Sequence, residues 1–202
     1  MLEELGSYMA AAAICSGSGN FGLAGSYSGN SSYNTSGVGL AYARKIGKLD
    51  AGVQFNYYSL HIATYGNASV PIIEGGIIYH FSDQFQAGIH LNQFARSAQE
   101  ELVQALPVIY SLGIGYNSFN NFFIGSELEK ENNGPVRMNV GMEYKFDQQL
   151  FARIGVSSST ATFYLGAGVL FHKIRLDVTA SVHPELGITP GLLLEYRLSN
   201  QE

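Results

Sequence analysis

Apolar and polar residues alternate along most of the chain with a period of two. Between positions 136 and 146, one face of an extended segment would carry Val136, Met138, Val140, Met142, Tyr144 and Phe146. The other face would carry Arg137, Asn139, Gly141, Glu143 and Lys145. The alternation recurs at 49–57, 85–92, 174–182 and 191–198. Because successive side chains of a β-strand point to opposite faces, the pattern predicts an all-β protein built from amphipathic strands of about ten residues.

The predicted connectors alternate between short and long. Short turns are expected at 44–48, 82–84, 117–121, 147–149 and 172–173. Longer or more polar connectors are expected at 28–36, 63–69, 95–105, 129–134, 157–161 and 183–189. Short periplasmic turns and longer extracellular loops are typical of antiparallel transmembrane β-barrels. The stretch 95–105 is rich in helix-forming residues, and we interpret it as a candidate short helix over the outer mouth.

Aromatic residues in the apolar phase fall beside the short turns. Strands are rich in aromatic residues in general, but that tendency would not confine the rings to one end of the strands. Aromatic rings prefer the interface between lipid and water, where they form girdles around membrane barrels. The predicted membrane girdle comprises Tyr42, Phe81, Phe85, Tyr116, Tyr144, Phe146, Phe171 and Tyr196.

Charged residues fall in the opposite phase, among many glycines. An Arg or Lys facing lipid at the bilayer midplane costs roughly 2–4 kcal/mol, so this phase predicts that the charges face a barrel lumen. Both signs are interleaved, and we expect a paired network that fills the lumen. The predicted lumen network comprises Glu74, Glu127, Glu129, Arg137, Glu143, Lys145, Arg153, Arg175, Asp177, Glu195 and Arg197.

Two short turns predict the register of this network. The turn at 147–149 places Glu143 opposite Arg153, and the turn at 172–173 places Gly168 opposite Asp177. From there Arg175 and Asp177 are expected to reach toward Glu195 on the last strand or Arg153 two strands back.

Composition agrees with a membrane barrel and excludes several other classes. Hydrophobic residues make up 46% of the 202 residues and charged residues only 13%, which is about half the charge of a soluble domain. No apolar run approaches the roughly 20 residues of a membrane helix. The net charge of −5 argues against nucleic acid as a partner. The single Cys15 excludes an internal disulfide.

No catalytic constellation can be assembled, so we expect no enzyme activity, no cofactor and no metal. His80 and His90 are predicted to face the lumen from adjacent strands, but a metal site needs further ligands. The sequence holds no Gly-x-Ser-x-Gly nucleophile elbow on a strand–helix turn. At the predicted outer rim, two X–Pro pairs favour a rigid turn, and a surface for a ligand or partner is the alternative. The rim residues are His183, Pro184, Thr189 and Pro190.

The strand count raises a question about the start of the chain. About twelve strands follow Phe21, and one more is predicted at Leu5–Ile14. We therefore divide the chain into a first partial strand and turn at 1–20 and a single barrel domain at 21–202. Thirteen is odd, whereas bacterial barrels have an even number of strands. A truncated larger barrel or a late-start gene model is our first expectation, supported by the lack of a signal peptide. The alternative is a plug or periplasmic stub followed by twelve strands that close alone.

Several segments carry a resemblance to a known family that extends over nearly the whole chain. They are Val38–Lys45, Gly52–Tyr58, Tyr65–Ser69, Leu106–Ser111, Phe151–Val156 and, most distinctively, Val182–Gly191. The sequence resembles the FadL-like outer-membrane barrels, most closely the PorV/PorQ-like proteins associated with type IX secretion. The resemblance implies a barrel of about fourteen strands with an N-terminal hatch in the lumen. Residues matching the hatch and the first strand do not occur here, and the C-terminus does not end on an aromatic residue.

Two functions are open at this point. The first is a PorV/PorQ-like barrel in the outer-membrane bilayer that binds protein partners, such as secretion-system proteins, in secretion or surface attachment. The alternative is a FadL-like transporter with a pocket for a hydrophobic small molecule. The alternative would be favoured if the inward apolar residues formed one cavity. Those residues are Tyr58, Ile72, Ile78, Ile109, Phe151, Tyr164, Leu170 and Leu193.

Overall fold

All thirteen regular elements in the described part of the chain are β-strands. The computed structural model describes residues 6–63, 66–92, 108–118, 121–132, 134–146, 149–158, 161–185 and 187–198. The strands are β1 (Gly6–Ser16), β2 (Gly19–Gly29), β3 (Tyr33–Ile46), β4 (Leu49–Ile62), β5 (Gly66–His80), β6 (Phe85–Leu91), β7 (Ile109–Ser118), β8 (Phe122–Glu131), β9 (Val136–Phe146), β10 (Leu150–Ser157), β11 (Thr162–Phe171), β12 (Ile174–His183) and β13 (Gly187–Tyr196). Within these residues, no helix combines the length and the apolarity that crossing a bilayer would require.

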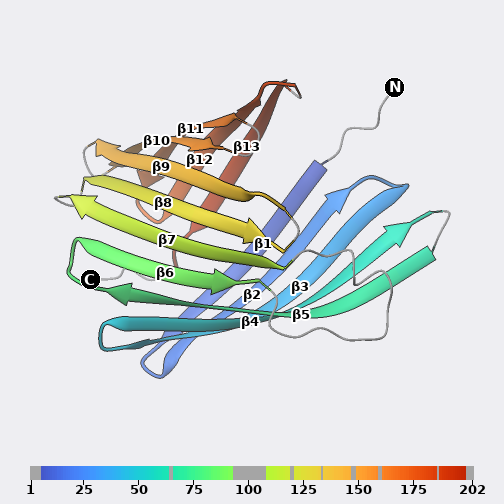
Figure 1. Ribbon diagram of the computed structural model, residues 1–202, viewed down its shortest axis with the longest axis horizontal. Helices are drawn as coiled ribbons and strands as arrows, with labels where there is room; N and C mark the ends of the chain where they lie inside the picture. The colour runs from blue at the N-terminus through green and yellow to red at the C-terminus, as the bar shows by residue number, and fades with distance from the viewer. Residues whose placement is uncertain are drawn as a thin grey trace. The chain divides into compact units, whose positions relative to one another are not determined.

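The strands form one antiparallel sheet in sequence order, from β1 to β13 (Figure 1). The prediction of an all-β antiparallel fold is confirmed, and the described residues contain the predicted initial strand and twelve strands after it. The strand order begins at β1 and ends at β13, and closure of the sheet into a barrel stays a prediction. By their contacts the residues divide into two compact units. The first unit contains β1–β4, β5 up to Tyr79 and most of β6, and the second contains most of β7 and β8 together with β9–β13.

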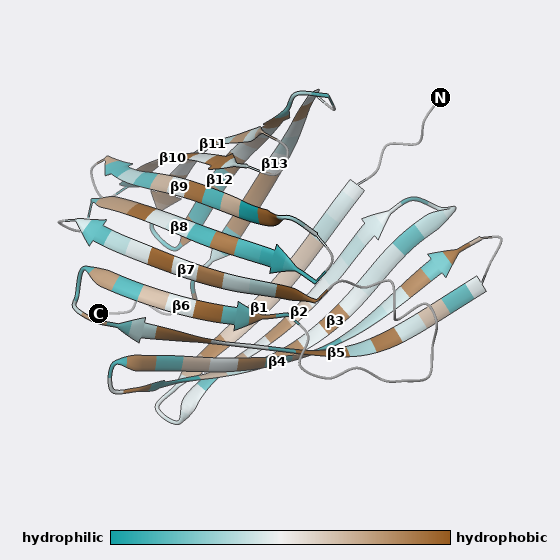
Figure 2. Ribbon diagram, in the orientation of Figure 1, coloured by the Kyte–Doolittle hydropathy of each residue, from teal (hydrophilic) through white to brown (hydrophobic). Residues whose placement is uncertain are grey.

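The apolar phase of the strands forms a face that is exposed in both units. In the first unit Leu40 is 61% exposed, and in the second unit Leu192 is 74% exposed. Figure 2 shows the alternation of hydrophobic and hydrophilic residues along the strands. We call the face that carries these side chains the apolar face and the opposite one the polar face. A folded protein normally turns its large apolar side chains inward, so a continuous exposed row of them requires an explanation.

Few side chains of the described residues are buried, and half of those are polar. The buried hydrophobic residues are Val70, Ile72 and Phe151, and the buried polar residues are Asn56, Thr162 and Asp177. Asp177, at 1% exposure, is more buried than any of the three hydrophobic residues. The usual distribution of a soluble domain, with apolar residues inside and charges outside, is therefore inverted here.

The register predicted from the two short turns is confirmed. Glu143 pairs with Arg153 across β9 and β10, and Gly168 pairs with Asp177 across β11 and β12. The predicted connectors are too long in several places, because polar residues that were assigned to loops continue the ladders. Ser69, for example, pairs with Ser59, and their hydroxyls lie 3.2 Å apart. The connector between β4 and β5 therefore begins at 63 and ends at 65. The predicted helix at 95–105 lies outside the described residues.

Candidate functional site

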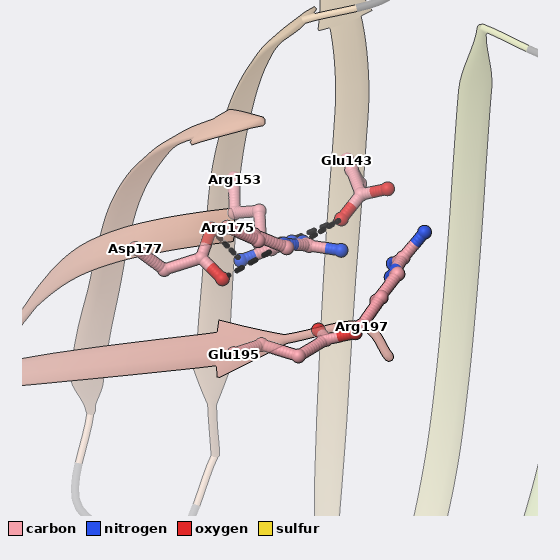
Figure 3. Close-up of polar contacts among 6 residues, drawn as sticks. All are labelled: Glu143, Arg153, Arg175, Asp177, Glu195 and Arg197. Carbon is pink, nitrogen blue, oxygen red and sulfur yellow. Dashed lines mark hydrogen bonds and ion pairs between the residues drawn. The ribbon is translucent and has the colours of Figure 1, made fainter. Parts of the chain in front are cut away.

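Four charged side chains of the second unit form a closed ring of ion pairs on the polar face. Arg153 on β10 donates from Nε to Glu143 Oε2 at 2.5 Å and from Nη1 to Asp177 Oδ1 at 3.1 Å. Arg175 on β12 donates from Nε to Asp177 Oδ2 at 2.9 Å, and its Nη2 lies 3.9 Å from Glu143 Oε2. Figure 3 shows these side chains converging from three strands. Two cations and two anions compensate each other, so the ring has no net charge. We call it the ion ring.

The neighbouring strands hold the ion ring in place. Asp177 lies opposite Gly168 on β11, and a Cβ atom at position 168 would overlap the Asp177 carboxylate. The glycine therefore leaves the space in which the carboxylate lies flat against the sheet. On the other side, the Arg175 guanidinium stacks 4.5 Å from the centre of the buried Phe151 ring.

The other predicted network residues of the second unit lie apart from the ion ring. Arg197 pairs with Glu195 at 2.8 Å, and Arg137 pairs with Glu129 at 3.4 Å. Glu195 lies opposite Arg175 in the register, but the cation that binds it is Arg197, two residues further along the chain. Lys145 Nζ lies 5.8 Å from the centre of the Phe151 ring. Glu127 accepts a long hydrogen bond of 3.5 Å from Asn139.

The first unit has a polar chain of a different kind on its polar face, which we call the amide chain. Gln54 Nε2 donates to Asn56 Oδ1 at 2.7 Å, and Asn56 Nδ2 donates to Glu74 Oε1 at 2.7 Å. His90 Nε2 lies 3.6 Å from the other oxygen of Glu74. Glu74 was predicted from its charge, whereas the two neutral amides were not. The signal that sequence reasoning missed is Gly39, which lies opposite the buried Asn56 and leaves room for its amide.

A groove of about 970 Å³ lies on the polar face of the second unit, beside the ion ring. Its floor is a row of glycines at one level of the ladder, formed by Gly125, Gly141 and Gly155. Phe123 and Tyr164 contribute aromatic walls, and Glu143 and Arg153 of the ion ring also line it. The glycine floor leaves this groove open, whereas the side chains of the ion ring fill the neighbouring part of the polar face.

In the described part of the chain, the apolar residues that the sequence placed on the inner face lie in different surroundings. Tyr58 and Ile72 pack against Val70 in the first unit. In the second unit Phe151 is covered by Arg175, and Tyr164 is the one member of the predicted set that lines the groove.

The predicted girdle residues lie on the apolar face, and several contact other aromatic rings. Tyr42 lies 5.1 Å from the ring of Phe21, and Phe81 lies 5.4 Å from Phe85. Tyr144 lies 4.6 Å from Phe146, next to the turn between β9 and β10. Tyr116 on β7, and Phe171 and Tyr196 at the ends of β11 and β13, are exposed.

The four predicted rim residues lie around the two ends of the connector between β12 and β13, and the predicted connector at 183–189 is too long. His183 ends β12, and its Nδ1 accepts a hydrogen bond of 3.1 Å from the backbone N–H of Glu185, after Pro184. Thr189 and Pro190 belong to β13, where they pair with Ser181 and Ala180. A proline is tolerated there because the missing donor of an outermost strand can face away from the neighbouring strand.

In the described part of the chain, no group of three or more His, Cys, Asp or Glu side chains could hold a metal ion. The free Cys15 is exposed on β1. No protein-family model matches the chain, and no curated protein matches it significantly.

Proposed function

We propose that this chain is the wall of an outer-membrane β-barrel, with the apolar face toward lipid and the polar face toward the lumen. One observation carries the proposal: apolar side chains such as Leu192 and Leu40 are exposed, while the charged Asp177 is buried. Lipid removes the cost of exposing apolar side chains, and pairing lowers the cost of burying charges. The inversion is costly for a sheet surrounded by water.

Fractionation and spectroscopy test this placement. We expect the protein to be recovered with outer membranes, to require detergent for extraction and to show circular dichroism dominated by strands. Its mobility in gels is expected to change on heating, because membrane barrels stay folded in detergent until heated. Recovery as a detergent-free monomer in water would overturn the proposal.

Within this class we propose a PorV/PorQ-like role, in which the barrel binds protein partners in secretion or surface attachment. The ion ring supports a binding role over that of an open pore, because Glu143, Arg153, Arg175 and Asp177 occupy part of the polar face and satisfy one another. The test is mild-detergent co-purification from cross-linked outer membranes, with the single-channel conductance of the purified protein measured in parallel. A reproducible protein partner and low conductance are expected.

A FadL-like transporter of hydrophobic small molecules is the second candidate, favoured by the groove of about 970 Å³. Grooves of roughly 300–1,000 Å³ are typical of small-molecule sites. If this candidate holds, purification yields a bound hydrophobic molecule and no protein partner. Substituting Tyr164→Ala, which removes one wall, would then release that molecule. Large conductance in the unmodified protein would contradict both roles and indicate an open pore.

A further inference from the structure

A second groove, of about 660 Å³, lies in the first unit and is lined by residues of β1, β2, β3 and β4. We propose that it binds one phospholipid of the surrounding bilayer, with an acyl chain in the groove and the headgroup against its hydroxyl-bearing end. The inference rests on the proposed placement in a membrane. It adds a specific lipid site to a face that otherwise meets lipid without selectivity.

The register divides the apolar-face side of this groove into two rows. The row nearest the connectors at 30–32 and 63–65 carries four hydroxyl groups, because Tyr8 pairs with Tyr27, Tyr27 with Ser36 and Ser36 with Ser59. The next row consists of Ala10, Gly25, Val38 and Tyr57. Along the strand direction the groove therefore changes from a row with four hydroxyl groups to a mainly apolar row in which Tyr57 carries the one hydroxyl.

Two small residues create the depression. Ala10 and Gly25 lie side by side on β1 and β2. The larger Tyr8 and Tyr27 lie in the adjacent row, and the larger Val38 follows Gly25 in the same row. A Cβ atom at Gly25 would meet one backbone atom, Gly37 O, at 3.9 Å. A Cβ atom therefore fits at position 25 without a clash. Lipid-facing positions of the second unit, such as Leu165 and Leu192, carry bulky aliphatic side chains instead.

The chemistry of the lining favours a lipid over other occupants. Within the described part of the chain, every side chain that lines the groove is uncharged. A polar peptide or an anionic ligand would find no charge to pair with. Tyrosine side chains prefer the membrane interface, where the ring meets acyl chains and the hydroxyl meets headgroups. An amphipathic occupant matches the change from hydroxyl groups to apolar groups, and the lack of a cation favours a zwitterionic headgroup over an anionic one.

The test compares two leucine substitutions on the apolar face. Gly25→Leu fills the groove, whereas Ala167→Leu adds the same side chain to an exposed position on β11 outside it. Each protein is equilibrated with phosphatidylcholine in mixed micelles, and native mass spectrometry measures the fraction that retains one lipid after dilution. We expect about a tenfold loss of retention for Gly25→Leu, which is the scale of a modest change in affinity, and none for Ala167→Leu. Gly25→Ala, whose Cβ fits, is expected to give a smaller loss and covers the case in which leucine prevents folding.

Three results would overturn the lipid site. One is equal retention in the unmodified protein, Gly25→Ala and Gly25→Leu, and another is an equal loss in Ala167→Leu. The third is a protein bound at the groove in place of lipid and released by Gly25→Leu. A protein that extracts with outer membranes yet retains no lipid refutes this site alone, whereas a protein absent from outer membranes refutes the proposed function as well.

Discussion

The polar faces of the two units hold their buried groups in different ways. In the second unit, Asp177 lies between Arg153 and Arg175, and both cations also approach Glu143. In the first unit, Glu74 receives a hydrogen bond from the neutral Asn56 and a weaker contact from His90. Both arrangements use a glycine opposite the most buried polar residue, Gly168 in one and Gly39 in the other.

The comparison shows that the same backbone arrangement, a glycine opposite a buried polar side chain, accommodates both a ring of ion pairs and a chain of amide hydrogen bonds. A glycine on the neighbouring strand makes room for a polar side chain to lie flat, whatever its charge. The ion ring then depends on every member, because removing one charge leaves others uncompensated. The amide chain depends on hydrogen bonds from neutral donors to one carboxylate, so each lost member costs less. The following substitutions test this difference.

Asp177→Ala is expected to have the largest effect. It removes the anion shared by Arg153 and Arg175, leaving two cations and one carboxylate. Breaking a buried ion pair by removing one partner costs about 3–5 kcal/mol. Thermal and denaturant unfolding in detergent measure the loss. The control is Asp83→Ala, which removes an exposed aspartate from the connector between β5 and β6 and should change stability little. Equal effects of the two substitutions would show that the ion ring does not contribute specifically.

Asn56→Ala is expected to have the second largest effect. It removes the donor that lies 2.7 Å from Glu74, and it also removes the oxygen that accepts the hydrogen bond from Gln54 Nε2. The loss of a hydrogen bond to a charged group is worth about 1.5–3 kcal/mol. Asn139→Ala is the matched control, because Asn139 makes only a 3.5 Å contact with Glu127. The comparison between units would fail if Asn56→Ala cost more than Asp177→Ala in the same unfolding assay.

Gly168→Ala is expected to cost about 1–3 kcal/mol, the usual penalty for overpacking. The added Cβ would displace the Asp177 carboxylate from its place against β11 and lengthen its bonds to the arginines. Gly113→Ala on β7 provides the control, since its Cβ would make an ordinary 3.7 Å contact with Ser126 O. If the two alanine variants unfold at the same temperature, the space opposite Asp177 is not required.

Glu195→Ala is expected to have the smallest effect, under about 1 kcal/mol. Its partner Arg197 is half exposed, and the pair at 2.8 Å lies outside the ion ring. The same unfolding assay applies, repeated at low and high salt to detect a screened interaction. A loss as large as that of Asp177→Ala would place Glu195 within the ion ring, in disagreement with the contacts.

The sequence predicted the strands and two contacts of the ion ring, because both follow from a period of two. These contacts are Glu143 with Arg153 and Asp177 with Arg153, whereas the contacts of Arg175 were not predicted. Once the turn at 147–149 was located, counting back along two strands placed Glu143 opposite Arg153. The same counting gave Gly168 opposite Asp177. Contacts between strands that are not adjacent, such as that of Arg153 with Asp177, could be predicted because all the charged side chains lie on the same face of the sheet.

Other features could not be predicted, for physical reasons. The amide chain was missed because Gln54 and Asn56 carry no charge, and nothing in their spacing distinguishes a buried amide from an exposed one. The start of β5 was placed too late, because Ser69 was assigned to a connector although its hydroxyl pairs with that of Ser59 across the ladder. The connector was extended to Thr189 because proline normally ends pairing, but Thr189 and Pro190 both pair within β13, where that argument does not hold for an outermost strand.

The ion ring also bears on how the protein folds. Glu143 and Arg153 belong to one hairpin, ten residues apart, and can meet as soon as that hairpin forms. Asp177 lies 24 residues beyond Arg153 and reaches it only after β11 has paired on both sides. Until then Arg153 can pair with Glu143 but not with Asp177, and Arg175 can pair with Asp177 but not with Glu143. Four strands must therefore acquire their correct register before the last charges are neutralised, so a register slip in any of them is penalised late in assembly rather than tolerated.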